Sequence, residues 1–94
     1  MEFLVRFEVQ PPDDMSDEER TRLRGLERRR ASELREAGVL RRLWRVPGTR
    51  AVVGLWEAQD ATQLHDALAS LPMFPWLSAT VEALATHPQE AGPR

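Results

Sequence analysis

The first ten residues alternate between apolar and polar side chains. One face of this segment carries Phe3, Val5, Phe7 and Val9, and charged residues fall opposite them. A period of two residues is typical of a half-buried β-strand. The pattern predicts a strand over residues 2–10, which the run PPDD brings to an end.

A helical pattern follows the prolines. Ser16 and Glu19 have the spacing of a capping box, and Gly38 is a natural stop. With a rotation of about 100° per residue, the apolar residues of this helix form one stripe. The stripe consists of Leu23, Leu26, Leu34 and Ala37.

A hairpin is expected next, because residues 39–46 and 50–57 have strand composition and are separated by the turn pair Pro47-Gly48. Asp60 with Gln63 then opens a shorter helix. Its apolar residues, continued into the connection that follows, are Leu64, Leu68 and Leu71. After the apolar connection LPMFPW, residues 78–86 predict a last strand.

The predicted order of elements is β-α-β-β-α-β, the ferredoxin-like α+β plan with an antiparallel sheet. We expect one domain over residues 1–88 and a flexible C-terminal tail over 89–94. The helices of such a fold cover one face of the sheet, so the other face needs a second copy to cover it. A homo-oligomer of the dimeric α+β barrel type is therefore expected.

Composition narrows the possible chemistry. The 94 residues include no Cys, Tyr or Lys, which excludes disulfides, thiolate nucleophiles, phenol acids and Schiff bases on lysine. There is no apolar run long enough to cross a bilayer and no basic-then-apolar leader. We expect a cytoplasmic protein without a membrane partner.

The charges are unevenly distributed although the net charge is −2. Five acidic residues cluster between Asp13 and Glu19, and eleven of the thirteen arginines lie between Arg20 and Arg50. A basic stretch can contact nucleic acid. Acidic residues interrupt this one and no nucleic-acid motif accompanies it, so a solvated helix face is the better interpretation.

Glu27 is the main candidate for chemistry, because it falls in the apolar sector of the first helix together with Arg30. Desolvation would raise the pKa of a carboxyl there and suit it to proton transfer near neutral pH. The alternative is a structural ion pair between Glu27 and Arg30 at i, i+3 spacing. The sequence leaves both interpretations open.

Other catalytic patterns are absent from the sequence. His65 and His87 are isolated and give no metal-ligand spacing, the serines have no nucleophile motif, and no Gly-rich phosphate loop occurs. If the chain is an enzyme, a reaction without cofactor or metal remains. Arginines of the hairpin alternate between the sheet faces, so one or two should point toward the helices and could bind a carboxylate or bridge subunits. They are Arg41, Arg42, Arg45 and Arg50.

The chain resembles the muconolactone Δ-isomerase family over nearly its whole length. The segments that carry the resemblance are FLVRFEV, PPDDM, the helix with Glu27, RRLWRVPG, LHDAL, LPMFP and the closing HP. The resemblance implies a ferredoxin-like subunit assembled into dimers and then a decamer. It also implies a cofactor-independent isomerase that moves a proton along a butenolide ring, converting muconolactone to the 3-oxoadipate enol-lactone in aromatic catabolism.

The resemblance also assigns roles to individual residues. Glu27 matches the family's acidic position and would be the proton-shuttling base. Substrate-binding positions are expected at Trp44, Arg45, Arg50, His65, Phe74 and Trp76, and Leu43 and Pro75 match the family as well.

One segment departs from the family pattern. After Gly48 the family carries a histidine, an aromatic hydroxyl and an amide, where this chain has Thr49, Arg50 and Val52. The resemblance together with this departure implies muconolactone or a related lactone as the substrate. The alternatives are a non-catalytic small-molecule binding or assembly protein, a biosynthetic isomerase or cyclase, and a cofactor-free oxygenase on the same fold.

LPMFPW places large apolar side chains on a connection, where polar residues are usual. Its two prolines fix the backbone and remove two amide donors. Leaving both Phe74 and Trp76 in water would forgo roughly 1.5–3 kcal/mol for each ring. We predict that Phe74 or Trp76 is buried at a subunit boundary that also borders the Glu27 pocket.

Overall fold

The structure is a computed structural model and describes residues 1–90. Its elements follow the predicted order and end close to the predicted positions. They are β1 (Glu2–Val9), α1 (Asp17–Glu36), β2 (Leu40–Arg45), β3 (Val52–Glu57), α2 (Ala61–Ala69), the 3₁₀ turn η1 (Phe74–Trp76), β4 (Leu77–Leu84) and the 3₁₀ turn η2 (Pro88–Glu90).

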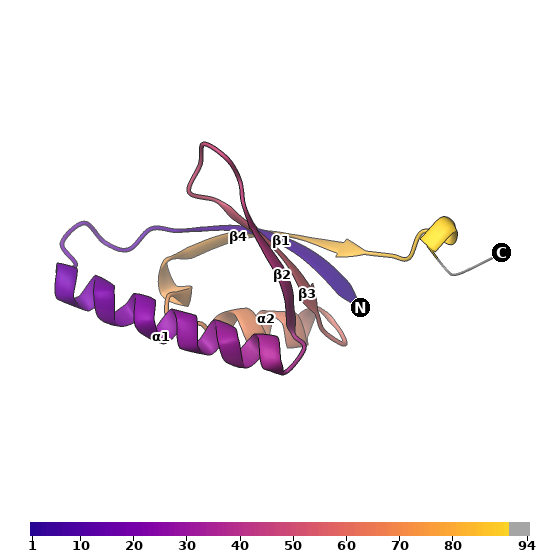
Figure 1. Cartoon of the computed structure of the whole chain (residues 1–94), viewed down its shortest axis with the longest axis horizontal. Helices are drawn as coiled ribbons and strands as arrows, with labels where there is room; N and C mark the ends of the chain where they lie inside the picture. Colours follow the sequence, from indigo (N-terminus) through magenta and orange to yellow (C-terminus); the bar gives the residue numbers. More distant parts are fainter. Residues whose placement is uncertain (91–94) are drawn as a thin grey trace.

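The four strands form one antiparallel sheet in the order β2-β3-β1-β4. Both helices lie on the same side of this sheet, and the end of β4 extends away from them toward η2 (Figure 1). The predicted α+β ferredoxin-like fold is confirmed. Of the predicted tail 89–94, Gln89 and Glu90 belong to η2, and the remaining four positions lie outside the described residues.

The local signals for the helix ends are confirmed. The Ser16 side chain accepts a hydrogen bond from the Glu19 backbone N–H at 3.1 Å, and the Asp60 side chain accepts one from Gln63 at 2.8 Å. Gly38 follows α1 with a φ of 77°, a left-handed conformation that favours glycine. No helix within residues 1–90 is both long and apolar enough to cross a bilayer.

The core lies between the sheet and the two helices. It combines Phe3, Val5 and Trp56 from the sheet with Leu34, Leu64, Leu68 and Leu71. On α1 the predicted apolar stripe is only half right, because Leu23 and Leu34 are buried whereas Leu26 and Ala37 are exposed. The helix turns the side that carries Glu27 and Ala31 toward the sheet, so its buried face is rotated away from Leu26.

Candidate active site

A cavity of about 840 Å³ opens between α1 and the sheet. Most of the apolar lining comes from the strands and from the connection after α2. The one carboxylate of the lining, that of Glu27, comes from α1. Apolar lining residues are Phe7, Val9, Pro11, Ala31, Leu40, Leu43, Val52, Trp56, Leu71 and Met73; the polar ones are Glu27 and the arginines 20, 24, 28, 45 and 50. A volume of this order is typical of small-molecule sites.

Glu27 is half-buried in the cavity wall and hydrogen-bonded to the LPMFPW connection. Its Oε1 accepts a hydrogen bond from the backbone N–H of Met73 at 3.1 Å. The connection is held in turn by backbone bonds from Phe74 to Leu71 (2.9 Å) and from Trp76 to Met73 (3.0 Å). A rigid turn therefore fixes the orientation of the carboxylate.

Burial raises the pKa of Glu27 above its ordinary value, and the hydrogen bond from Met73 opposes that rise only in part. The alternative of a Glu27–Arg30 ion pair is wrong. Arg30 instead pairs with Glu33 at 3.0 Å and donates to the Ser70 hydroxyl at 2.9 Å. Glu27 is left as a partly desolvated carboxylate that takes up a proton more readily than an exposed glutamate, which suits a group that accepts and returns a proton.

Four arginines around the cavity are available to a ligand. Within the part of the chain that the structure describes, the guanidinium groups of Arg24, Arg28, Arg45 and Arg50 form no hydrogen bond or ion pair. The fifth, Arg20, donates to the carbonyls of Pro12 (2.8 Å) and Met15 (3.3 Å) and so holds the β1–α1 connection. Unpaired guanidinium groups beside an apolar cavity favour an anionic ligand, above all a carboxylate.

Trp56 contributes a neutral donor to the same cavity. The residue is only 1% exposed, and its indole Nε1 is buried without a hydrogen-bond partner among residues 1–90. An unpaired buried donor costs about 1–3 kcal/mol, so such groups are rare in folded proteins. Trp56 is itself a lining residue, so this unpaired donor lies close behind the cavity wall.

The structure brings some of the sequence-predicted residues together and separates others. Arg45 and Arg50 line the cavity with Glu27. Trp44 lies on the opposite face of the sheet, 41% exposed, with the Arg42 guanidinium 5.0 Å from its ring centre. A register shift between Leu40 and Arg42 is the reason, since it turns Leu43 and Arg45 toward α1 and Trp44 away.

The remaining candidates lie outside the cavity lining. His65 and Phe74 contact each other edge to face, with their ring centres 5.8 Å apart, and Trp76 is half-buried in η1. The LPMFPW segment does form a wall of the site, but through Leu71 and Met73 and not through its two rings.

Sequence reasoning missed the arginines of α1 and the donor of β3. The cavity-lining polar residues of α1 lie four, three and one positions apart, so the helical period could have revealed that they share one side of the helix. They are Arg20, Arg24, Glu27 and Arg28. Trp56 carries no such signal, because whether an indole N–H finds a partner depends on the packing around it.

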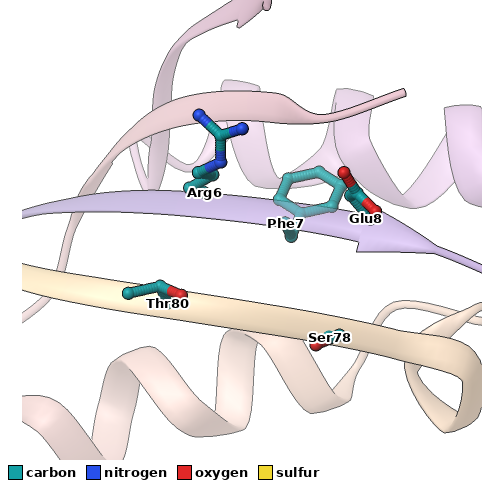
Figure 2. Close-up of a pocket in the computed structure, with 5 residues that line it drawn as sticks. All are labelled: Arg6, Phe7, Glu8, Ser78 and Thr80. Carbon is teal, nitrogen blue, oxygen red and sulfur yellow. The ribbon is translucent and has the colours of Figure 1, made fainter. Parts of the chain in front are cut away.

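A second depression on the surface, of about 160 Å³, lies elsewhere on the sheet. Figure 2 shows its lining, in which Arg6 and Glu8 of β1 face Thr80 and Ser78 of β4, next to Phe7. The four polar side chains are exposed and the depression contains neither Glu27 nor an unpaired buried group. The larger cavity is the candidate active site.

Comparison with known proteins identifies the family of this chain. A sequence model of the family described as muconolactone delta-isomerase matches residues 1–90. A muconolactone Delta-isomerase 2 of Acinetobacter lwoffii is 37% identical over 87 residues, which cover 93% of this chain and 91% of the relative. A muconolactone Delta-isomerase of Pseudomonas aeruginosa is 35% identical over 88 residues, with 94% and 92% covered.

A solved structure is also similar over the full length. The crystal structure of muconolactone isomerase at 3.3 Å resolution superposes with a TM-score of 0.88 and 33% identity, covering 100% of this chain and 98% of that one. Family, curated relatives and fold agree from one end of the described chain to the other. This chain belongs to the muconolactone Δ-isomerase family.

Proposed function

We propose that this isomerase moves a proton within a small unsaturated γ-lactone that carries a carboxylate, with Glu27 as the base. Muconolactone, which the relatives' names give as their substrate, is the compound of that class to test first. The observation that carries the proposal is the half-buried carboxylate of Glu27, which forms no ion pair within residues 1–90, in a cavity otherwise lined by apolar side chains and arginines.

The chemistry requires one group that accepts a proton and returns it at another carbon. Glu27 takes the proton from the ring carbon next to the ring oxygen, and the electrons of that C–H bond move through the double bond onto the lactone carbonyl oxygen. The protonated Glu27 then delivers the proton to the carbon next to the carbonyl. The product is the isomeric enol-lactone and no other reactant is consumed. A raised pKa makes Glu27 a stronger base for the first transfer.

The arginines supply the binding of the substrate carboxylate. Arg45 and Arg50 approach from the hairpin and Arg24 and Arg28 from α1, so the cavity offers guanidinium groups on two sides. Guanidinium and carboxylate pair through two parallel hydrogen bonds, which fixes orientation as well as position. Arg50 and the apolar Val52 stand where the resemblance led us to expect neutral polar groups, so this chain relies more on charge.

The proposal is tested by incubating the protein with muconolactone in deuterium oxide. We expect formation of the 3-oxoadipate enol-lactone, with solvent deuterium appearing next to the carbonyl wherever the proton on Glu27 exchanges before it is returned. Tight binding of muconolactone without turnover would contradict the proposal and favour a binding protein. Oxygen consumption on a quinol-like substrate would favour an oxygenase instead.

We also propose that the chain works as a homo-oligomer. The sheet face opposite the helices is uncovered, and the exposed large apolar residues include Trp44, Val81 and Leu84. Sedimentation at micromolar concentration is expected to show an assembly larger than the 10.7 kDa chain. The placement of Phe74 or Trp76 at a subunit boundary stays a prediction, under which Trp76→Ala and Phe74→Ala should weaken that assembly. A wild-type monomer would contradict the proposal.

A further inference from the structure

We propose that the indole N–H of Trp56 donates a hydrogen bond to the ring carbonyl oxygen of the bound lactone and stabilises the negative charge that develops there. This inference rests on the function proposed above and adds a second group that contacts the reacting atoms. It assigns a task to the unpaired donor in the cavity wall.

The absence of a side chain at Gly54 leaves room for the indole N–H of Trp56. A Cβ at position 54 would lie 2.7 Å from Trp56 Nε1 and 3.0 Å from Leu43 Cδ2, so the indole and the leucine both fill the space of a missing side chain. Leu43 is 37% exposed and therefore free to shift. Displacement of its side chain by a ligand brings an acceptor to the indole N–H.

The surroundings of Trp56 select a neutral acceptor over a charged one. The four unpaired arginines are exposed, whereas Trp56 is buried in the apolar core with residues such as Leu40 and Leu34. A carboxylate would lose its hydration beside the indole without gaining an opposite charge, so it belongs at the arginines. A carbonyl oxygen enters an apolar site more cheaply, and its hydrogen bond strengthens as it becomes an oxyanion.

The carbonyl oxygen carries that negative charge during only part of the reaction. When the C–H bond next to the ring oxygen breaks, the electron pair moves to the carbonyl oxygen and gives a dienolate. When the new C–H bond forms, the carbonyl is restored and the charge disappears. A donor fixed in advance by packing needs no rearrangement at that moment, which is the condition under which such donors accelerate a reaction.

The first test is Trp56→Phe, which keeps an aromatic ring and removes the donor. We expect kcat on muconolactone to fall about 10²–10³-fold, with a smaller change in KM. Gly54→Ala keeps the indole but forces it from its position, and is expected to lower kcat in the same way. An unchanged kcat in Trp56→Phe would overturn the inference.

A second test separates a hydrogen bond from a packing effect. Binding is measured in the Glu27→Gln background, where turnover of the lactone is strongly slowed. The two probes are muconolactone and 2,5-dihydrofuran-2-ylacetate, which has the same ring and carboxylate without the carbonyl. Adding Trp56→Phe is expected to weaken binding of muconolactone severalfold and to leave the carbonyl-free probe unchanged. Equal losses for both probes, or no loss for either, would overturn the inference.

Failure of this inference remains distinguishable from failure of the proposed function. The proposed function is tested by turnover in the wild-type chain and by its loss in Glu27→Gln. The role of Trp56 is tested by the dependence of binding on the ring carbonyl, which is measured as an affinity and not as a rate of turnover.

Discussion

Glu27→Gln is expected to lower kcat on muconolactone by about 10²–10⁴-fold, the usual effect of removing a general base. Glutamine keeps the shape of the side chain and can still accept the hydrogen bond from the Met73 N–H, so the cavity should be preserved. Steady-state kinetics on the purified variant measure the effect. Full activity of the variant would show that Glu27 does not transfer the proton.

Stability distinguishes this loss from misfolding. Burial raises the pKa of Glu27 in the folded chain above its value in the unfolded chain. The stability that the protonated group contributes is present below the unfolded pKa and is lost as the pH rises through the folded pKa. At neutral pH the carboxylate therefore opposes folding, and Glu27→Gln should melt no lower than the wild type. Glu33→Gln, an exposed change on the same helix, is the matched control and should keep its activity.

The same shift sets the acid limb of the pH profile. As a base, Glu27 must be ionised in the free enzyme, so kcat/KM should fall as the pH drops through its pKa. Since burial raises that pKa, the fall should begin above the ordinary value of 4.5.

We expect the second large effect when the charge of a cavity-lining hairpin arginine, Arg45 or Arg50, is removed. Hydrogen bonds to charged groups contribute about 1.5–3 kcal/mol, so Arg45→Gln or Arg50→Gln should raise KM by roughly tenfold or more. Their effect on kcat should be smaller, because the carboxylate is bound alike in the ground state and the transition state. The KM of the wild type should also rise with salt, since exposed charges are screened.

Arg41→Gln is the matched control for this pair. It removes the same charge from the same hairpin, but Arg41 does not line the cavity. If Arg41→Gln raised KM as much as Arg45→Gln and Arg50→Gln, the effect would be one of overall charge and not of contact with the substrate.

The parts of this protein that the sequence reveals are those set by local chemistry. Ser16 and Asp60 cap their helices through bonds to residues three positions on, and Gly38 ends α1 because it adopts a left-handed conformation. Glu27 could be singled out because a charged residue interrupts an apolar helix face. Each of these inferences depends on neighbours within one or two helical turns.

The parts that the sequence hides depend on contacts between distant segments. The bond from Met73 to Glu27 joins residues 46 positions apart, and only the folded chain brings them together. The rotation of α1 that carries Arg24 and Arg28 into the site depends on how the helix packs on the sheet. The register shift in β2 has no glycine or proline to announce it, so simple alternation gave no sign that Trp44 faces outward.

That register shift has a consequence for how the family's binding preference can diversify. If β2 kept its length and paired without this irregularity, alternation from Leu40 would turn Arg42 and Trp44 toward α1 in place of Leu43 and Arg45. Deletion of Arg41 would instead restore regular pairing and keep Leu43 and Arg45 in the wall. A shift of register at constant strand length therefore exchanges two wall positions at once, which is a shorter evolutionary route to a new ligand than substitutions made one side chain at a time.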